Sequence, residues 1–478
     1  MNDRNRLTKP LIKENGSFKE ISFEEARAVI VTKIKAVTPE QNAFFAGARL
    51  PNEELYMIQK LARAGVNTAN IDSFHYMGRK EGFFENSHHN VPLDQLNNAR
   101  QIFILDSEIN YEHAVPGFYA QNARFRNKVR MELLTTKEQS SMDHKVDQVT
   151  RIRSSYYFIK AAIHHILGKG LENRVFIGDH CEGFESYRDH VLSTGFDELV
   201  SRAGTTAAEI VRFAEAFNRE AHAVIMYGEQ NISGNTCIEL RNLCAITGKT
   251  GKSASGIIAL KEKNNSQGLF DMGAVHNTLV GGLDAHDPEQ AALLKKAWGA
   301  THLPLQNGHA PDELLALNKI KNTFIFGEDP LGCAEDKEAM KSLLKKTDFL
   351  LVQDMFMSET AMQADLIMPA SLPIETGGSF SNTQKFIQQF SNGFESPLEE
   401  SSFEQLKELH LAFGLKADYE SPADVMLEAA ALMQKPTGND RLCTLAPTTD
   451  EDKKKVFRHG CDYLLKRFNS EWEQAFTE

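Results

Sequence analysis

A short loop in the middle of the chain gathers side chains that could hold an anion. Two lysines and three amides fall within seven consecutive positions: Lys261, Lys263, Asn264, Asn265 and Gln267. Cationic and amide groups are the hydrogen-bond donors that a pyrophosphate needs. The alternative interpretation is a solvated loop in which the asparagines are turn residues. The loop is therefore a candidate ligand-binding site.

Two groups of polar residues come directly after predicted strands. Open α/β sheets bind nucleotides at the carboxyl ends of their strands, so these positions are candidates for ligand contact. Acidic side chains there can accept the N–H groups of a guanine or the hydroxyls of a ribose. The residues are Gly327, Glu328 and Asp329 after a strand at 323-326, and Gln353 and Asp354 after a strand at 349-352.

A third candidate is the glycine-rich run GGSFSN, which contains Gly378 and Asn382. Glycines let a backbone approach a ligand closely. They equally well form a turn that serves only the backbone. We expect both residues to contact the ligand that binds the other two candidate sites.

Short apolar runs alternate with helical patterns along the chain, which is typical of parallel sheets covered by helices. The sequence therefore predicts the α/β class. The predicted strands are 42-45, 101-105, 129-134, 174-177, 223-226, 323-326, 349-352 and 365-368. The predicted helices are 22-37, 52-64, 153-167, 206-218, 236-247, 335-346 and 402-413.

The composition excludes several classes of protein. The 478 residues carry a formal net charge of −12, which argues against a nucleic-acid partner because phosphates require a basic face. No uninterrupted apolar run approaches the roughly 18 residues that a spanning helix requires, and the N-terminus has no apolar targeting segment. We expect a cytoplasmic protein with no transmembrane segment.

The six cysteines are scattered without any CxxC pair. They therefore predict neither a zinc ribbon nor an iron–sulfur cluster in this chain. Reduced thiols, most of them buried, are the expected state.

Five segments in the same order resemble one family. The run LKEKNNSQGLFDMG at 260-273 resembles the LRGxNNVQGxxDMG segment of formate dehydrogenase-type molybdopterin oxidoreductases. The segments RLTKPLIKENGSFKEISFEEA, PNEELYMIQKLARAGVNTANID and MYGEQNISGNTCIELRNLCAITGKTGKSASG are similar to other parts of the family. The run with the GEDP turn, the VQD strand end and the GGSFSN loop is similar to its guanosine-binding part. The implied cofactor is molybdopterin guanine dinucleotide.

The resemblance implies two interleaved Rossmann-like domains with parallel sheets, as in domains II and III of formate dehydrogenase. We expect a discontinuous cofactor-binding domain at 1-75 plus 255-415 and an inserted α/β domain at 76-254. Residues 416-478 are expected to form a helical C-terminal tail. Relative to the family pattern, the iron–sulfur domain before residue 1 and the pterin-binding β-barrel after the tail are expected to be missing.

The sequence departs from the family at its catalytic positions. The cysteine or selenocysteine that ligates the metal aligns with Gly78, and the histidine after it aligns with Arg79. The Gln-His pair near the substrate aligns with Gln230 and Asn231, so Gln230 alone keeps the family residue type. An oxygen ligand from Asp72 or Ser73 is the alternative metal ligand. We therefore assign no catalytic and no metal-ligating residue.

These departures favour a non-catalytic scaffold subunit, a pseudoenzyme within an electron-transfer complex, much as the G subunit of NADH-quinone oxidoreductase resembles formate dehydrogenase. The expected partners are iron–sulfur or NADH-oxidising subunits. One alternative is an active oxidoreductase of formate dehydrogenase type, split so that partners supply the metal ligand and clusters. Another is a guanine-dinucleotide binding module.

Overall fold

The computed structural model describes residues 5–77, 83, 90–285, 287–304, 309–433 and 443–450. The chain divides into two compact units, each assembled from separated segments. Unit 1 comprises 1–78, 263–435 and 456–478, and unit 2 comprises 79–262 and 436–455. The predicted domain boundaries at 75/76, 254/255 and 415/416 stay a prediction. Of the predicted tail at 416-478, residues 416–433 belong to unit 1 and residues 443–450 belong to unit 2.

Unit 1 is built on a seven-stranded sheet in the order β2-β1-β15-β14-β13-β3-β4. The strands from β15 to β4 are parallel, whereas β1 runs antiparallel to β15 and β2. The strands are β1 (Leu11–Glu14), β2 (Ser17–Glu20), β3 (Asn42–Ala46), β4 (Ile71–Asp72), β13 (Asn322–Phe326), β14 (Phe349–Asp354) and β15 (Leu366–Pro369).

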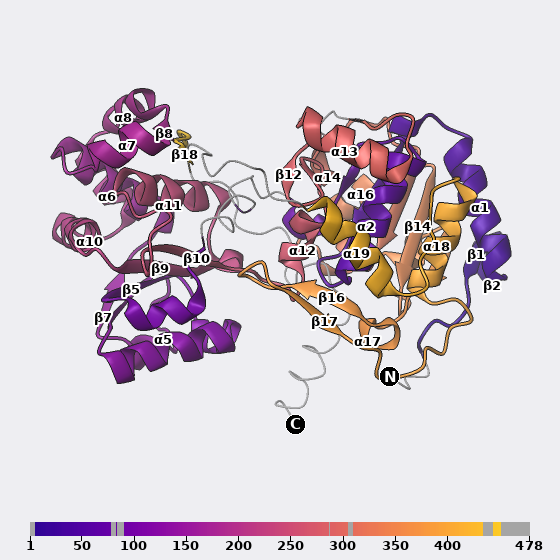
Figure 1. Ribbon diagram of the computed structural model, residues 1–478, viewed down its shortest axis with the longest axis horizontal. Coiled ribbons are helices and arrows are strands. Elements are labelled where there is room, and N and C mark those ends of the chain that lie inside the picture. The colour runs from indigo at the N-terminus through magenta and orange to yellow at the C-terminus, as the bar shows by residue number, and fades with distance from the viewer. Residues whose placement is uncertain are drawn as a thin grey trace. The chain divides into compact units, whose positions relative to one another are not determined.

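Helices cover both faces of this sheet (Figure 1). Because successive strand residues point to opposite faces, Phe44 and Phe324 stack on one face at 4.8 Å while Phe45 and Ile325 enter the core on the other.

The helices are α1 (Phe23–Lys35), α2 (Asn52–Lys60), α12 (Ser266–Asp271), α13 (Pro288–Trp298), α14 (Pro311–Ala316), α15 (Pro330–Cys333), α16 (Lys337–Leu344), α17 (Pro373–Thr376), α18 (Ser402–Ala412) and α19 (Pro422–Leu432). The short turns are η1 (Pro39–Gln41), η2 (Leu61–Gly65), η3 (Phe74–Tyr76) and η8 (Ala361–Gln363). Two hairpins add β11 (Thr278–Leu279), β12 (Leu283–Asp284), β16 (Gly378–Ser381) and β17 (Ile387–Phe390).

Unit 2 contains a five-stranded parallel sheet in the order β10-β9-β5-β6-β7. Its core strands contribute Ile102, Ile104 and Met226 to one face, and Phe103 packs edge-on against Phe213 on the other at 4.9 Å. The strands are β5 (Gln101–Leu105), β6 (Arg130–Thr135), β7 (Gln148–Arg151), β9 (Ala223–Gly228) and β10 (Gly256–Leu260).

The helices of unit 2 alternate with these strands along the chain. They are α4 (Ile109–Glu112), α5 (Ala114–Asn127), α6 (Ser155–Gly168), α7 (Arg174–His180), α8 (Phe184–Leu192), α9 (Phe196–Ala203), α10 (Ala207–Arg219) and α11 (Gly234–Ile246). Short turns occur at η5 (Leu93–Asn98), η6 (Asp143–Lys145) and η7 (Glu229–Asn231). A separate two-stranded pair joins β8 (Cys181–Glu182) to β18 (Cys443–Thr444).

The predicted α/β class with parallel sheets is confirmed, with β1 and β2 as an antiparallel edge of the sheet in unit 1, but one predicted strand is wrong. Residues 174-177 lie in α7 rather than in a strand. The reason is local: the side chain of Asn173 accepts a hydrogen bond from Phe176 N at 3.0 Å and so caps a helix. By contrast, the helix predicted from SFEEA begins as expected, since Ser22 and Glu25 form a complete capping box. Among the described residues, no helix is long and apolar enough to span a bilayer.

Candidate functional site

The strand order of unit 1 reverses at the boundary between β3 and β13. From β3 the chain adds β4 on one side, and from β13 it adds β14 and β15 on the other. The loops after β3 and β13 therefore meet at a topological switch point, where open α/β sheets bind ligands. Gly47 N donates to Phe326 O at 2.9 Å, and a Cβ on Gly47 would lie 2.3 Å from Gly327 O. Only glycine allows the two loops to approach this closely.

Glu328, the residue after Gly327, organises the loop after β4, the strand that pairs with the far side of β3. Its carboxylate accepts hydrogen bonds from Ser73 Oγ at 2.7 Å, from Phe74 N at 3.0 Å and from His75 N at 3.1 Å. Burial raises the pKa of Glu328 to about 8, and the nearby charge of Asp72 adds to this rise. Glu328 therefore bonds to the protein's own loop with both of its oxygens.

Asp329 caps the short helix α15 with one of its two carboxylate oxygens. Its Oδ1 accepts hydrogen bonds from Gly332 N at 3.0 Å, Thr360 N at 2.9 Å and Thr360 Oγ1 at 2.7 Å. Its Oδ2 is buried and has no hydrogen-bond partner among the described residues. A buried acceptor without a donor costs free energy, so this atom is a candidate ligand contact.

The residues at the end of β14 are engaged inside unit 1. Gln353 Nε2 donates to Gln405 Oε1 of α18 at 2.7 Å, so this amide faces the helix layer. Asp354 Oδ1 accepts from Met355 N at 2.7 Å. Burial raises the pKa of Asp354 to about 7, and the charge of Asp329 contributes.

In the loop before α12, two amides fasten the loop to its surroundings. Asn265 Nδ2 donates to Leu50 O at 2.7 Å, and its Oδ1 accepts from Ser381 N at 2.8 Å. Asn264 Oδ1 accepts from Arg49 Nη1 at 3.4 Å. The loop thus lies beside the segment that follows β3.

Two further residues of this loop are buried. Lys263 is 7% exposed, and its backbone N–H donates to Ser266 Oγ at 2.9 Å. Gln267 Nε2 donates to Asp271 Oδ1 at 2.8 Å, whereas its Oε1 is buried with no hydrogen-bond partner among the described residues. Gln267 Oε1 is therefore a second buried acceptor without a donor among the described residues.

The strand β16 of the β16–β17 hairpin contacts the loop before α12, because Ser381 N donates to Asn265 Oδ1. Gly378 has a φ of +142°, and a Cβ there would lie 2.8 Å from Glu53 Oε2. Asn382 stands at the exposed turn, where its Oδ1 accepts from Gln384 N at 2.9 Å and Phe386 N at 3.1 Å. Gly378 lies beside the start of α2, whereas the side chain of Asn382 shapes its own turn.

Sequence reasoning missed two histidines in unit 1. His75 Nε2 hydrogen-bonds with Ser266 Oγ at 3.0 Å, which links the β4 loop to the loop before α12. His276 Nδ1 hydrogen-bonds with Asp72 Oδ2. The loops after β3, β4 and β13, residues 263–267 and these two histidines are called the strand-end cluster below.

The two proposed oxygen ligands already have protein partners. Asp72 Oδ1 accepts from Ser73 N at 2.6 Å, and Ser73 Oγ donates to Glu328. Gly78 and Arg79 lie outside the described residues. Among those described, no group of three or more His, Cys, Asp or Glu side chains could hold a metal ion.

Unit 2 has its own switch point, between β5 and β9. Gly228 N at the end of β9 donates to Ser107 Oγ after β5 at 2.7 Å. Gln230 Nε2 donates to His113 Nε2 at 3.0 Å. Burial lowers the pKa of His113 to about 4. His113 is therefore a neutral imidazole near pH 7.

Lys261 lies at the end of β10 in unit 2. Its ammonium forms a buried ion pair with Glu229 Oε1 at 2.5 Å and donates to Phe83 O at 2.9 Å. Gln230 Oε1 is buried with no hydrogen-bond partner among the described residues. The charge of Lys261 is thus balanced within the unit, while Gln230 keeps a free acceptor.

The predicted site residues separate into two groups. Lys261 and Gln230 belong to unit 2, and all the others belong to unit 1, where the strand-end cluster includes most of them. Gln353 and Asn382 point elsewhere within unit 1. The position of His113 after the strand predicted at 101-105 was a signal in the sequence, because strand ends are candidate sites, but its pairing with Gln230 was not.

The family match and the most similar relatives point to the same family of proteins. The sequence profile of the family described as Molybdopterin oxidoreductase matches residues 6–410. The F420-dependent formate dehydrogenase 2 subunit alpha of Methanococcus maripaludis is 28% identical over 456 residues, covering 92% of this chain and 67% of the relative. Subunit alpha of formate dehydrogenase 1 from the same organism is 30% identical over 407 residues, covering 82% of this chain and 60% of the relative.

A relative from Staphylococcus haemolyticus that is named for formate dehydrogenase is 27% identical over 458 residues, which is 92% of this chain and 46% of the relative. The chain therefore spans between about half and two thirds of the length of these curated relatives. Among solved structures, acetylene hydratase from Pelobacter acetylenicus has a TM-score of 0.66 at 16% identity, covering 90% of this chain and 65% of that chain. This structural similarity shows that the two proteins share a fold.

Proposed function

Since this chain belongs to the molybdopterin oxidoreductase family, we propose that it is the cofactor-cradling subunit of a formate dehydrogenase-like redox complex. In this proposal it binds a molybdopterin guanine dinucleotide and acts as a scaffold rather than as a complete catalyst. Iron–sulfur or NADH-oxidising partners would carry the electrons.

The observation that carries the proposal is the unpartnered Oδ2 of Asp329 at the switch point of unit 1. A guanine or pterin ring presents N–H groups at its edge, and a carboxylate oxygen is the natural acceptor for them. Gln267 Oε1 offers a second buried acceptor in the same unit, and the close approach of Gly47 and Gly327 keeps side chains out of the loops. The residues present therefore suit a dinucleotide of this kind.

When bound, such a cofactor carries a metal on its dithiolene sulfurs and supplies the redox chemistry. The chain's own contribution is to bind and orient it. The family position of the metal-ligating thiolate is Gly78, which has no side chain, and the first cysteine along the chain is Cys181. This is the reason for proposing a scaffold.

The experiment is to isolate the full chain from its native host together with the chains that co-purify. Pterin, molybdenum, tungsten and iron are then quantified, and formate-dependent reduction of a viologen dye is assayed. The scaffold proposal expects pterin on this chain, an iron-containing partner and no formate turnover. Formate turnover with stoichiometric molybdenum or tungsten would contradict it and favour the split oxidoreductase. A guanine nucleotide without pterin would contradict it in favour of the binding module.

A further inference from the structure

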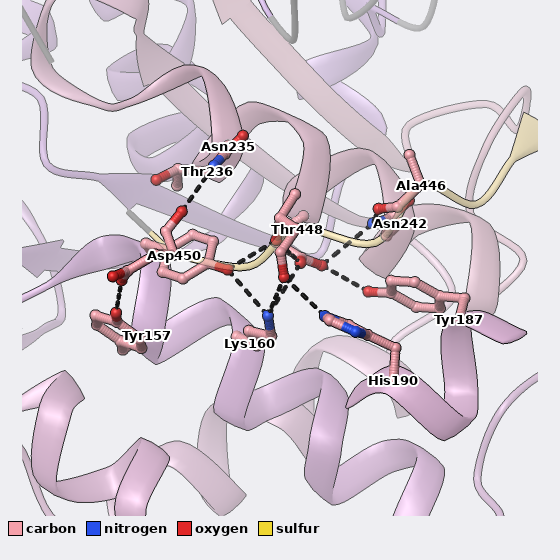
Figure 2. A network of polar contacts seen from close by, with 12 residues as sticks. Tyr157, Lys160, Tyr187, His190, Asn235, Thr236, Asn242, Ala446, Thr448 and Asp450 are labelled. Carbon is pink, nitrogen blue, oxygen red and sulfur yellow. Dashed lines mark hydrogen bonds and ion pairs between the residues drawn. The ribbon is translucent and has the colours of Figure 1, made fainter. Parts of the chain in front are cut away.

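Residues 443–450, called the strap below, lie along the helices of unit 2 although they follow α19 of unit 1 in sequence. The strap begins with β18, which pairs in parallel with β8. Leu445 N continues this pairing by donating to Glu182 O at 3.1 Å. Its remaining residues contact α6, α8 and α11 (Figure 2).

Thr448 anchors the strap in a buried polar network (Figure 2). The Lys160 ammonium donates to Thr448 O and to Tyr156 Oη, the latter at 2.9 Å. His190 Nε2 also donates to Thr448 O, at 2.9 Å. Thr448 Oγ1 donates to Glu239, whose carboxylate is fully buried. Because Lys160 and Glu239 are both buried, losing these partners would be costly.

Other strap residues are fixed independently. Asn242 Nδ2 donates to Ala446 O at 2.9 Å, and Asn235 Nδ2 donates to Asp450 O at 2.7 Å. Tyr157 Oη donates to the carboxylate of Asp450. These contacts hold the strap at several points along its length, so its first residue has a fixed register.

That first residue, Cys443, faces a second cysteine. Cys443 and Cys181 are directly paired in the register of β18 and β8, and their thiols hydrogen-bond with each other. Neighbouring strands lie about 4.7–4.9 Å apart, which is inside the Cα separation of about 4.4–6.8 Å that a disulfide requires. Both thiols are free and only partly buried. The register therefore brings the two Cα atoms within the range that a disulfide spans.

We propose that Cys181 and Cys443 are a thiol–disulfide pair, and that oxidation by a low-molecular-weight disulfide fastens the strap covalently to the segment between α7 and α8. In the reduced state the strap is held by the polar network alone. In the oxidised state it is tied at its first residue as well.

The exchange proceeds in two balanced steps. The Cys443 thiolate attacks one sulfur of the external disulfide, whose S–S bond breaks, and one thiolate leaves and takes up a proton. Cys181 then attacks the Cys443 sulfur of the mixed disulfide, and the second external thiolate leaves and is protonated. The two cysteines lose two electrons and two protons, which the external disulfide gains.

The surroundings favour Cys443 as the attacking sulfur. The hydrogen bond from Cys181 lowers the pKa of Cys443 to about 7, and the charge of Arg241 assists. The same hydrogen bond and burial raise the pKa of Cys181. Cys244 lies close by, but burial raises the pKa of its thiol to about 12, so it reacts slowly. Reaction at Cys443 followed by closure onto Cys181 is the expected route.

The test uses the full chain, folded, in glutathione buffers of increasing glutathione disulfide content. After an acid quench, alkylation and trypsin digestion, Cys181 lies in peptide 175–188 and Cys443 in peptide 442–453. The expected product is one linked pair of these peptides, lighter than their sum by two hydrogen atoms and absent from both Cys181→Ser and Cys443→Ser. Cys244→Ala is the matched control and should keep the link. Free thiols at every ratio, a Cys244–Cys443 link or a link between two chains would overturn the proposal.

A second measurement tests the fastening itself. Amide exchange at Leu445 requires the strap to open, so the disulfide should slow it by roughly tenfold or more in the oxidised protein. The Cys181→Ser variant should show no such slowing in the same buffers. Unchanged exchange in a protein that carries the link would overturn the fastening of the strap.

Discussion

Ser73 Oγ donates a 2.7 Å hydrogen bond to the buried carboxylate of Glu328, although 255 residues separate the two. The bond ties the loop after β4 to the loop after β13. The same carboxylate accepts two backbone N–H groups of the β4 loop, from Phe74 and His75. The spacing of loops at the switch point of unit 1 therefore depends on this acid and its three donors.

Replacing Ser73 by alanine should weaken unit 1, because it removes one donor from a buried carboxylate. We expect the free energy of unfolding to fall by about 1–3 kcal/mol. Urea unfolding followed by Trp298 fluorescence reports this, with Trp472→Phe as the background so that Trp298 is the only tryptophan. Ser342→Ala at an exposed position of α16 is the control and should change stability by less than about 0.5 kcal/mol. Equal stability of both variants would show that the Ser73 bond does not matter.

Alanine at Gly47 should disturb the switch point by sterics alone. Its Cβ would lie 2.3 Å from Gly327 O, so one of the two loops must move. Overpacking of this kind costs about 1–3 kcal/mol, measured by the same urea unfolding. Gly393→Ala is the matched glycine, since its Cβ would meet Ile374 at an ordinary 3.4 Å. Gly47→Ala as stable as Gly393→Ala would rule out the close approach.

The stability of unit 1 should fall as the pH rises from about 5 to 8. Burial raises the pKa of Glu54 and of Glu328 to about 8 and that of Asp354 to about 7. Between the ordinary carboxyl values and these values the folded chain holds protons that the unfolded chain has released, so unfolding becomes easier as pH increases. Urea unfolding at a series of pH values measures the slope.

Glu54→Gln should make this slope shallower, because one of the three carboxyls no longer titrates. Glu24→Gln, at an exposed position of α1, should keep the slope of the parent protein. The pH argument fails if unit 1 becomes more stable across this window.

In unit 2, alanine at Gly228 should separate Gln230 from His113. Its Cβ would lie 2.8 Å from both Gln230 Oε1 and His113 Nε2. Burial now holds the pKa of His113 at about 4, so exposure should raise it toward the ordinary value of 6.5. The imidazole resonance of His113, assigned with His113→Gln, gives the titration midpoint by NMR.

Gly168→Ala serves as the control for this change, because nothing lies closer than 3.8 Å to its Cβ. It should leave the His113 midpoint where the parent protein has it. A midpoint that stays near 4 in Gly228→Ala would mean that the burial of His113 does not depend on this glycine.

The sequence was sufficient for the elements that depend on local patterns. The buried parallel strands are continuous apolar runs, and caps such as Ser22 with Glu25 mark helix starts directly. The error at 174-177 has the same local origin: a run of four residues with three β-branched or aromatic members fits a strand, and the deciding cap from Asn173 lies just outside the run.

The site was predicted less well, since its electrostatics depend on partners that are distant in sequence. Lys261 looked like a free cation for an anion, but the fold places Glu229 beside it. Glu328 looked like an acceptor for a ligand, but the β4 loop supplies its donors. His113 escaped notice because its role depends on Gln230, which lies 117 residues away. Strand ends can be found from sequence, whereas the pairing of side chains there cannot.

The central claim is that the strand-end cluster binds a pterin dinucleotide through Asp329. The most direct test is the pterin content of Asp329→Asn, measured by fluorescence after oxidative release from the purified full chain. Asparagine keeps the helix cap, and its amide replaces the unpartnered Oδ2 with a donor. Asp336→Asn, which alters the exposed cap of α16, is the control. The account predicts pterin in the parent and in Asp336→Asn but at least about tenfold less in Asp329→Asn; equal pterin in all three, or none in the parent, would contradict it.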